Sequence, residues 1–274
     1  MHRYLRAAAM GAALSGLALP LLARENHDNR FDFQVNPRIF DPHRTSLVSS
    51  EWEMGTGCPT KATVRLFNTN PPYNLLPPSQ YTDPACPTGD GKDRGSEGLV
   101  LVKTGPTLND AAAVADLKGV KGKSISELGY DLRKPAASIS DPRGSHCGAG
   151  APRFDVVING EDYFVGCASP PPTSDQAGNG WQRLRWGGGD PAQPLLAYPA
   201  SGTCASPTVA APGGLCDIGG VPVDEIAIVF DEGQDGYGAP DQFGAAVLDN
   251  IDVNTVLVGR GPAGEGNGGG KGKE

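Results

Sequence analysis

The chain has 274 residues, of which 38% are hydrophobic and 7% aromatic, and its formal net charge is −8. This length fits one large domain or two small ones. The acidic balance argues against nucleic-acid binding, because phosphate contacts need clustered Lys and Arg.

Residues 1–23 have the layout of a secretory signal peptide. Arg3 and Arg6 form a basic start, residues 7–23 are apolar and small, and the sequence then turns polar. We predict cleavage near Ala23, with a retained N-terminal anchor as the alternative. No later run is apolar enough to span a bilayer. The mature protein is therefore expected to be soluble and exported, whether periplasmic, on the cell surface or released.

Six cysteines follow the signal segment, and an even number in an exported chain predicts three disulfides. The absence of a CxxC spacing argues against a zinc site. Six cysteines allow fifteen pairings, and we choose the sequential one because each pair brackets a plausible hairpin or loop. The predicted pairs are Cys58–Cys86, Cys147–Cys167 and Cys204–Cys216.

The 39 glycines and 25 prolines separate short apolar runs, a pattern that favours strands. Residues 24–45 are polar, and we expect them to be partly ordered at best. We predict strands at 62–68 and 98–104. Residues 107–119 form the one helix candidate, with Asn109 or Asp110 as a cap.

Alternating residues predict a half-buried strand at 126–134. Leu128, Tyr130 and Leu132 share one face there, and charged residues share the other.

The clearest local signal is a hairpin in residues 151–167. Asn159-Gly160 favours a type I′ turn, which needs positive φ at both central residues. Pairing outward from the turn places Phe154, Val156, Tyr163 and Val165 on one buried face, with Val157 opposite Asp162, Val156 opposite Tyr163, and Phe154 opposite Val165.

Further strands are predicted at 181–186, 224–232 and 246–253, and the Gly-rich residues 261–274 are expected to be a flexible tail. Eight or nine short strands without helical crossovers predict an all-β fold. We therefore expect a single disulfide-stapled β-sandwich of jelly-roll type over residues 46–260.

The order "GYDLR", hairpin, "WQRLRW", "IAIVFDEG", "VLDNIDVN" resembles galactose-binding-like jelly rolls, which include carbohydrate-binding modules. The stretch "CGAGAPRF…FVGC" resembles secreted bacterial proteins without implying an activity. The first resemblance implies a secreted, non-catalytic binding module for carbohydrate. It also implies a structural calcium that ties the last strand to loops near the start.

Asp249 lies on an apolar strand face between Val247 and Ile251, and a buried carboxylate must be hydrogen-bonded, paired or bound to a metal. Backbone N–H groups or an arginine would satisfy it. The resemblance makes Asp249 the candidate ligand of Ca²⁺, with Glu53 as co-ligand.

Sugar recognition needs an aromatic surface and polar side chains. Trp186 shares a face with Leu184 and is predicted to be core. Trp181 shares a face with Arg183 and is the better exposed candidate. Tyr237, in an acidic loop that ends at Asp241, is a second contact. The predicted ligand-binding residues are therefore Trp181, Arg183, Tyr237 and Asp241.

Two other functions stay open on sequence grounds. The first is a structural or protein-interaction domain that binds a cell-surface protein. The second is a glycan-active hydrolase or lyase, which needs two carboxylates on either side of one bond. Glu51, Glu53 and Asp231 are the carboxylates to test for that activity.

Overall fold

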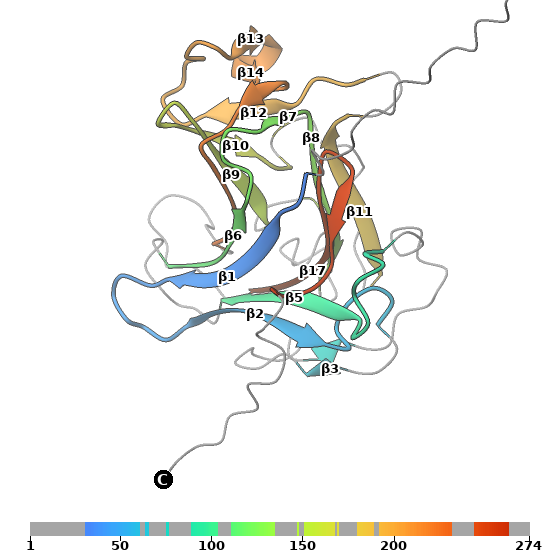
Figure 1. Cartoon of the computed structure of the whole chain (residues 1–274). Helices are drawn as coiled ribbons and strands as arrows, with labels where there is room; N and C mark the ends of the chain where they lie inside the picture. The colour runs from blue at the N-terminus through green and yellow to red at the C-terminus, as the bar shows by residue number, and fades with distance from the viewer. Residues whose placement is uncertain are drawn as a thin grey trace, which may run out of the picture. The chain divides into compact units, whose positions relative to one another are not determined.

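In the computed structural model, shown in Figure 1, the described residues from Asp32 onward form one compact unit. No helix among the described residues is long and apolar enough to cross a membrane. The predicted signal peptide lies outside those residues. The structure describes residues 31–60, 64–65, 75–76, 89–103, 111–134, 147, 151–167, 169, 180–188, 192–231 and 244–262.

Antiparallel strands in two main sheets make up most of the described fold. The large sheet has the order β1 (Gln34–Phe40), β6 (Ala112–Lys118), β16 (Glu225–Phe230), β9 (Arg153–Ile158), β10 (Glu161–Val165), β12 (Leu196–Pro199), β14 (Leu215–Asp217), β13 (Val209–Ala211). The small sheet has the order β11 (Trp181–Gly187), β8 (Glu127–Arg133), β17 (Gly244–Val253), β5 (Glu97–Lys103), β2 (Val48–Met54), and β18 (Val256–Val258) pairs with β17.

Two short ribbons complete the strands. They are β7 (Ser124–Ile125) with β15 (Val221–Pro222), and β3 (Val64–Arg65) with β4 (Leu75–Leu76). Of the strand predicted at 62–68, only β3 lies within the described residues.

The strand order is that of a jelly roll. Along the chain, β5, β8, β11 and β17 belong to the small sheet, while β6, β9, β10 and β16 belong to the large one. The last strand of each set is inserted between earlier ones, so that β16 lies between β6 and β9 and β17 lies between β5 and β8. This crossing of consecutive strands between two sheets defines the jelly-roll sandwich. The predicted fold class is confirmed.

Aromatic side chains fill the space between the sheets. Tyr130 of β8 and Trp186 of β11 meet Phe154 of β9, with ring centroids 5.5 to 6.1 Å apart. The Tyr130 hydroxyl donates to the Pro152 carbonyl, and the Trp186 indole donates to the Gly166 carbonyl. The polar atoms of these two aromatic side chains are therefore satisfied. Trp186 is core, as predicted.

The predicted hairpin is confirmed in its register. Asp162 pairs with Val157, Tyr163 with Val156, and Val165 with Phe154. Asn159 and Gly160 have φ values of 53° and 78°, so the turn supplies the backbone geometry that sets these pairs.

Two segments differ from the predictions. Residues 24–45 were predicted to be partly ordered at best, but this segment contains β1. That strand forms the edge of the large sheet and pairs with β6 along seven residues. The helix predicted at 107–119 is wrong where the structure describes it, since Ala112–Lys118 is strand β6. Pairing with β1 and β16 outweighs the helical preference of an alanine-rich segment.

Both faces of β8 are buried, which corrects the half-buried prediction. Asp131 and Arg133, on the face turned away from the large sheet, are fully buried. The same outer face of the small sheet carries a second apolar cluster, against which Cys58 packs. Its members are Val100, Val102, Trp181, Ala245 and Val247.

The disulfides Cys147–Cys167 and Cys204–Cys216 are confirmed. Cys58 is also disulfide-bonded, and its predicted partner Cys86 lies outside the described residues. Disulfides persist in oxidising compartments, which is consistent with an extracellular domain.

Candidate functional site

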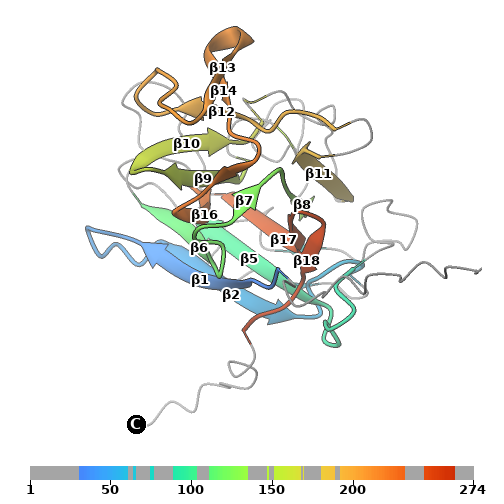
Figure 2. The same cartoon turned by 45° about the horizontal axis from the view of Figure 1, so that its top comes forward.

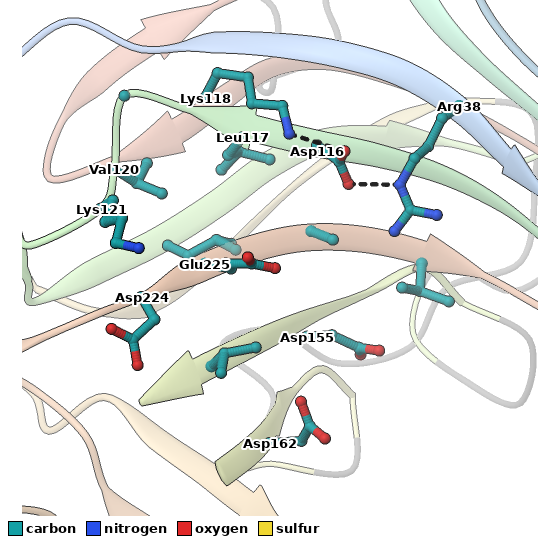
Figure 3. Close-up of a pocket in the computed structure, with 15 residues that line it drawn as sticks. Arg38, Asp116, Leu117, Lys118, Val120, Lys121, Asp155, Asp162, Asp224 and Glu225 are labelled. Atoms are coloured by element: carbon teal, nitrogen blue, oxygen red, sulfur yellow. Dashed lines mark hydrogen bonds and ion pairs between the residues drawn. The ribbon is translucent and has the colours of Figure 1, made fainter. Parts of the chain in front are cut away.

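The open face of the large sheet carries a groove. Two neighbouring hollows of about 460 and 320 Å³ cross its strands, and Arg38, Asp155 and Val229 line both. Side chains on this face come from β1, β6, β16, β9 and β10. Figure 3 shows them converging from these separate strands. A concave site with a few placed polar groups is the usual form of a ligand-binding site.

Sheet register explains how the groove is built. Asp116, Ala227 and Asp155 are directly opposite one another on β6, β16 and β9, and therefore share a face. Two residues further along, Val114 pairs with Val229 in the same way. Small apolar side chains thus form the floor, and carboxylates rise on either side of Ala227.

Ion pairs fix most of the charged groups in the groove. Arg38 donates to Asp116 at 2.7 Å, and Lys118 donates to the other oxygen of the same carboxylate at 3.0 Å. Arg153 bridges Asp155 at 2.9 Å and Asp231 at 2.7 Å. Side chains held in this way present oriented donors and acceptors to a ligand.

The two carboxylates beside Ala227 differ in their proton affinity. Burial raises the pKa of Asp155 to about 6, with the charge of Asp231 adding to the effect and Arg153 opposing it. Burial acts in the same direction on Asp116, but hydrogen bonds from Arg38 and Lys118 outweigh it and lower the pKa of that carboxyl. The groove therefore offers two different kinds of hydrogen-bonding carboxyl group near neutral pH.

An exposed aromatic residue lies at the β1 end of the groove. Phe40 lines the smaller hollow and is 49% exposed. Its position on the edge strand gives the groove an apolar surface next to its polar walls.

Of the four residues predicted for sugar binding, the two that the structure describes, Trp181 and Arg183, do not lie in this groove. Trp181 was expected to be exposed, and this is wrong: its side chain is 4% exposed within the cluster on the small sheet. Arg183 lies beside it on β11 and is bound to Asp131. Tyr237 and Asp241 lie outside the described residues.

Arg183 takes part in a buried polar network on the outer face of the small sheet. It donates two hydrogen bonds to Asp131, at 2.8 and 3.1 Å. The amide of Asn250 donates to the same carboxylate at 2.7 Å. Arg185 pairs with Asp252 at 2.8 Å. These contacts explain why charged residues can occupy the outer face of β8 and β11, where Asp131 is fully buried.

Asp249 is buried, as its place in the sequence indicated, and backbone N–H groups satisfy it. The amides of Cys58 and Asn250 donate to its two oxygens at 2.7 and 2.6 Å. Burial raises the pKa of Asp249 well above its usual range, and the two donors oppose that rise.

The proposed calcium ligands Asp249 and Glu53 lie on strands that are not neighbours. Glu53 is on β2, and β5 lies between that strand and β17. Glu53 is hydrogen-bonded to Glu51, its neighbour on the same strand face. Within the described residues, no three His, Cys, Asp or Glu side chains gather closely enough to hold a metal ion. Calcium binding by the chain stays a prediction.

We expect Glu53 to make stability depend on pH. Burial raises its pKa to about 7 from 4.5, and the charge of Glu51 and a hydrogen bond with it add to the rise. The protonated form therefore stabilises the fold fully below pH 4.5, and this contribution is lost as the pH rises through 7. Glu53→Gln should lose less stability between pH 5 and pH 8 than the wild type does, as measured by urea denaturation at both values. The exposed Glu161→Gln is the control, and equal losses in wild type and Glu53→Gln would contradict the assignment.

No protein-family model and no curated protein sequence matches the chain. Two solved structures are similar to it. The first is the family 11 carbohydrate-binding module of the cellulosomal cellulase Lic26A-Cel5E of Clostridium thermocellum, with a TM-score of 0.35 and 11% identity, over 84% of this chain and 89% of the other. The second is the family 11 module from Clostridium thermocellum in complex with a β-1,3-1,4-mixed-linked tetrasaccharide, with a TM-score of 0.33 and 12% identity, over 82% and 90%. The jelly-roll strand order described above is the part of the predicted resemblance that the chain itself shows.

The sequence contained a partial signal for the groove. In β16 and β9 the outward residues, which include Ala227 and Asp155, alternate with large apolar residues, and Asp116 is an outward residue of β6. Only the strand order brings these three positions into one row.

Proposed function

We propose that the groove on the large sheet binds a neutral carbohydrate chain without transforming it. The observation that carries this proposal is the row Asp116, Ala227 and Asp155, in which two carboxyl groups flank a small apolar floor across three strands. Carboxylates and guanidinium groups can hydrogen-bond sugar hydroxyls, while Ala227 and Val229 can contact the apolar face of a ring.

The charges in the groove favour a neutral ligand over an acidic one. Arg38, Lys118 and Arg153 are already bound to carboxylates. Asp162, Asp224 and Glu225 add further negative charge along the larger hollow. An acidic polysaccharide would bring its own carboxylates or sulfates against these groups, and like charges at an interface are strongly unfavourable.

The carboxylates proposed for hydrolysis are poorly placed for it. Glycoside hydrolysis needs two carboxyl groups separated by the bond to be cleaved. Glu51 and Glu53 are hydrogen-bonded to each other on one strand, and Asp231 is bound to Arg153. This arrangement favours binding over catalysis.

A glycan screen of the purified chain tests the proposal. We expect retention on one or more neutral polysaccharides, such as mixed-linked β-glucan, xylan, mannan or galactan, and no retention on polyuronate or sulfated chains. Retention only on acidic polysaccharides would contradict the proposal, as would a blank screen with a sample shown to be folded. A parallel screen with EDTA tests the calcium prediction.

A further inference from the structure

Strands β12, β14 and β13 form a lobe that continues the large sheet beyond β10 (Figure 2). They belong to the segment between β11 and β16, and they lie outside the eight strands that make up the jelly roll. The lobe therefore lengthens the face on which the groove lies.

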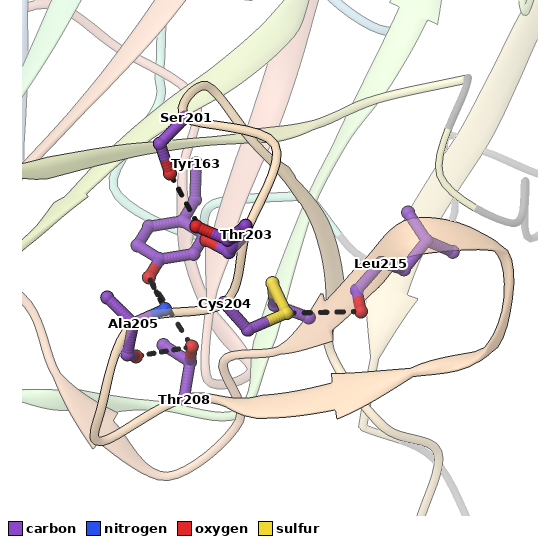
Figure 4. Close-up of a disulfide and its surroundings, with 8 residues drawn as sticks. Tyr163, Ser201, Thr203, Cys204, Ala205, Thr208 and Leu215 are labelled. Carbon is purple, nitrogen blue, oxygen red and sulfur yellow. Dashed lines mark hydrogen bonds between the residues drawn. A yellow bond between two sulfur atoms is a disulfide. The ribbon is translucent and has the colours of Figure 1, made fainter.

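A disulfide staples the lobe internally, and hydrogen bonds fix it to β10 (Figure 4). The disulfide Cys204–Cys216 joins a loop to β14, and Cys216 pairs with Ala197 of β12. The hydroxyl of the buried Tyr163, on β10, accepts a hydrogen bond from the Ala205 amide and contacts the Thr208 hydroxyl, both at 3.3 Å. The lobe is thus anchored to the hairpin that forms one wall of the groove.

This anchoring places Tyr198 on the same face as the groove. Tyr198 of β12 is opposite Phe164 of β10, which is opposite Asp155 of β9. Residues directly opposite one another share a sheet face. The Phe164 ring packs against the Arg153 guanidinium, 5.4 Å from its centroid. Tyr198 is 38% exposed and offers an aromatic surface beyond it.

Among the described residues, the exposed aromatic side chains Phe40 and Tyr198 of this face are far apart. Phe40 is on β1 and Tyr198 is on β12, five strand steps away. At about 4.8 Å per step, these strands lie about 24 Å apart. Only a chain of several sugar rings can contact both.

We propose that Tyr198 forms a distal subsite at which an extended neutral glycan stacks after crossing the groove, held in position by the disulfide-stapled lobe. This inference rests on the proposed carbohydrate binding. It adds that binding strengthens with chain length, and that the added strength comes from the lobe.

Calorimetric titration with oligosaccharides of increasing length tests the inference. The series, from trisaccharide to hexasaccharide, is prepared from whichever of mixed-linked β-glucan, xylan, mannan or galactan retains the wild type. We expect Tyr198→Ala to bind the hexasaccharide about tenfold more weakly, as for loss of an aromatic anchor, and to bind the trisaccharide as the wild type does. Tyr198→Phe should keep the hexasaccharide affinity. Met54→Ala removes an exposed apolar side chain from the small sheet and is the control.

The outcomes separate the two proposals. If none of the four polysaccharides retains the folded wild type, carbohydrate binding by the groove fails and the distal subsite fails with it. If the wild type binds and Tyr198→Ala matches it at every length, the subsite is wrong while the proposed function stands. Equal weakening at all lengths would also overturn the subsite. The double variant Cys204→Ser/Cys216→Ser should reproduce the length-selective loss.

Discussion

Replacing Ala227 with tryptophan is expected to weaken glycan binding by about 100-fold or more, which corresponds to about 2.7 kcal/mol. Ala227 lies between Asp116 and Asp155 on the groove floor, so an indole at this position occupies the space where a sugar ring would lie. The side chain points away from the core, and tryptophan is well tolerated in strands. We therefore expect a folded protein with a filled groove.

Affinity electrophoresis in gels containing the retained polysaccharide measures this effect. Met54→Trp adds the same side chain at an exposed position on β2 and should migrate as the wild type does. A folded Ala227→Trp protein with undiminished retention would show that the glycan binds somewhere other than the groove.

Replacing Asp131 with alanine is expected to lower the free energy of unfolding by about 3 kcal/mol. The Asp131 side chain is fully buried, and it accepts hydrogen bonds from Arg183 and Asn250. Its removal leaves these donors without a charged acceptor in a covered part of the sheet. This loss of unfolding free energy should lie at the low end of the range for breaking a buried ion pair, because the Arg183 side chain is 30% exposed and can reach water.

Urea denaturation of Asp131→Ala beside Asp116→Asn provides the comparison. Asp116 also binds an arginine, but this pair is on the surface, with side chains 47% and 23% exposed. Ion pairs on the surface contribute about 1 kcal/mol or less to the free energy of unfolding. Similar losses in the two variants would show that burial does not distinguish the two ion pairs.

Local sequence signals predicted the fold well where a single turn, or the alternation of apolar residues along one strand, determines the structure. The Asn159-Gly160 turn sets the hairpin register without help from distant residues. The alternation in β16, predicted as a strand at 224–232, places Ile226, Ile228 and Phe230 on one face, and all three are buried. The order of such elements was enough to indicate a jelly roll.

Features that depend on tertiary partners were not predicted. The Ala112–Lys118 segment has helical composition, and only its neighbours β1 and β16 make it a strand. Trp181 alternates with charged residues, as an exposed residue would, but it is buried in the apolar cluster on the outer face of its sheet. The groove was missed for a related reason, since its residues come from five strands that only the strand order brings together.

The outward faces of the two sheets differ, and this difference matters when the protein is immobilised on a solid support. Asp131, Arg183 and Asn250 bind one another in the small sheet, whereas polar side chains of the large sheet line an open groove. Met54, at the end of β2 in the small sheet, is 73% exposed and is not among the residues lining the groove. A single attachment made at this position would tether every molecule through the same residue and leave the groove residues unmodified.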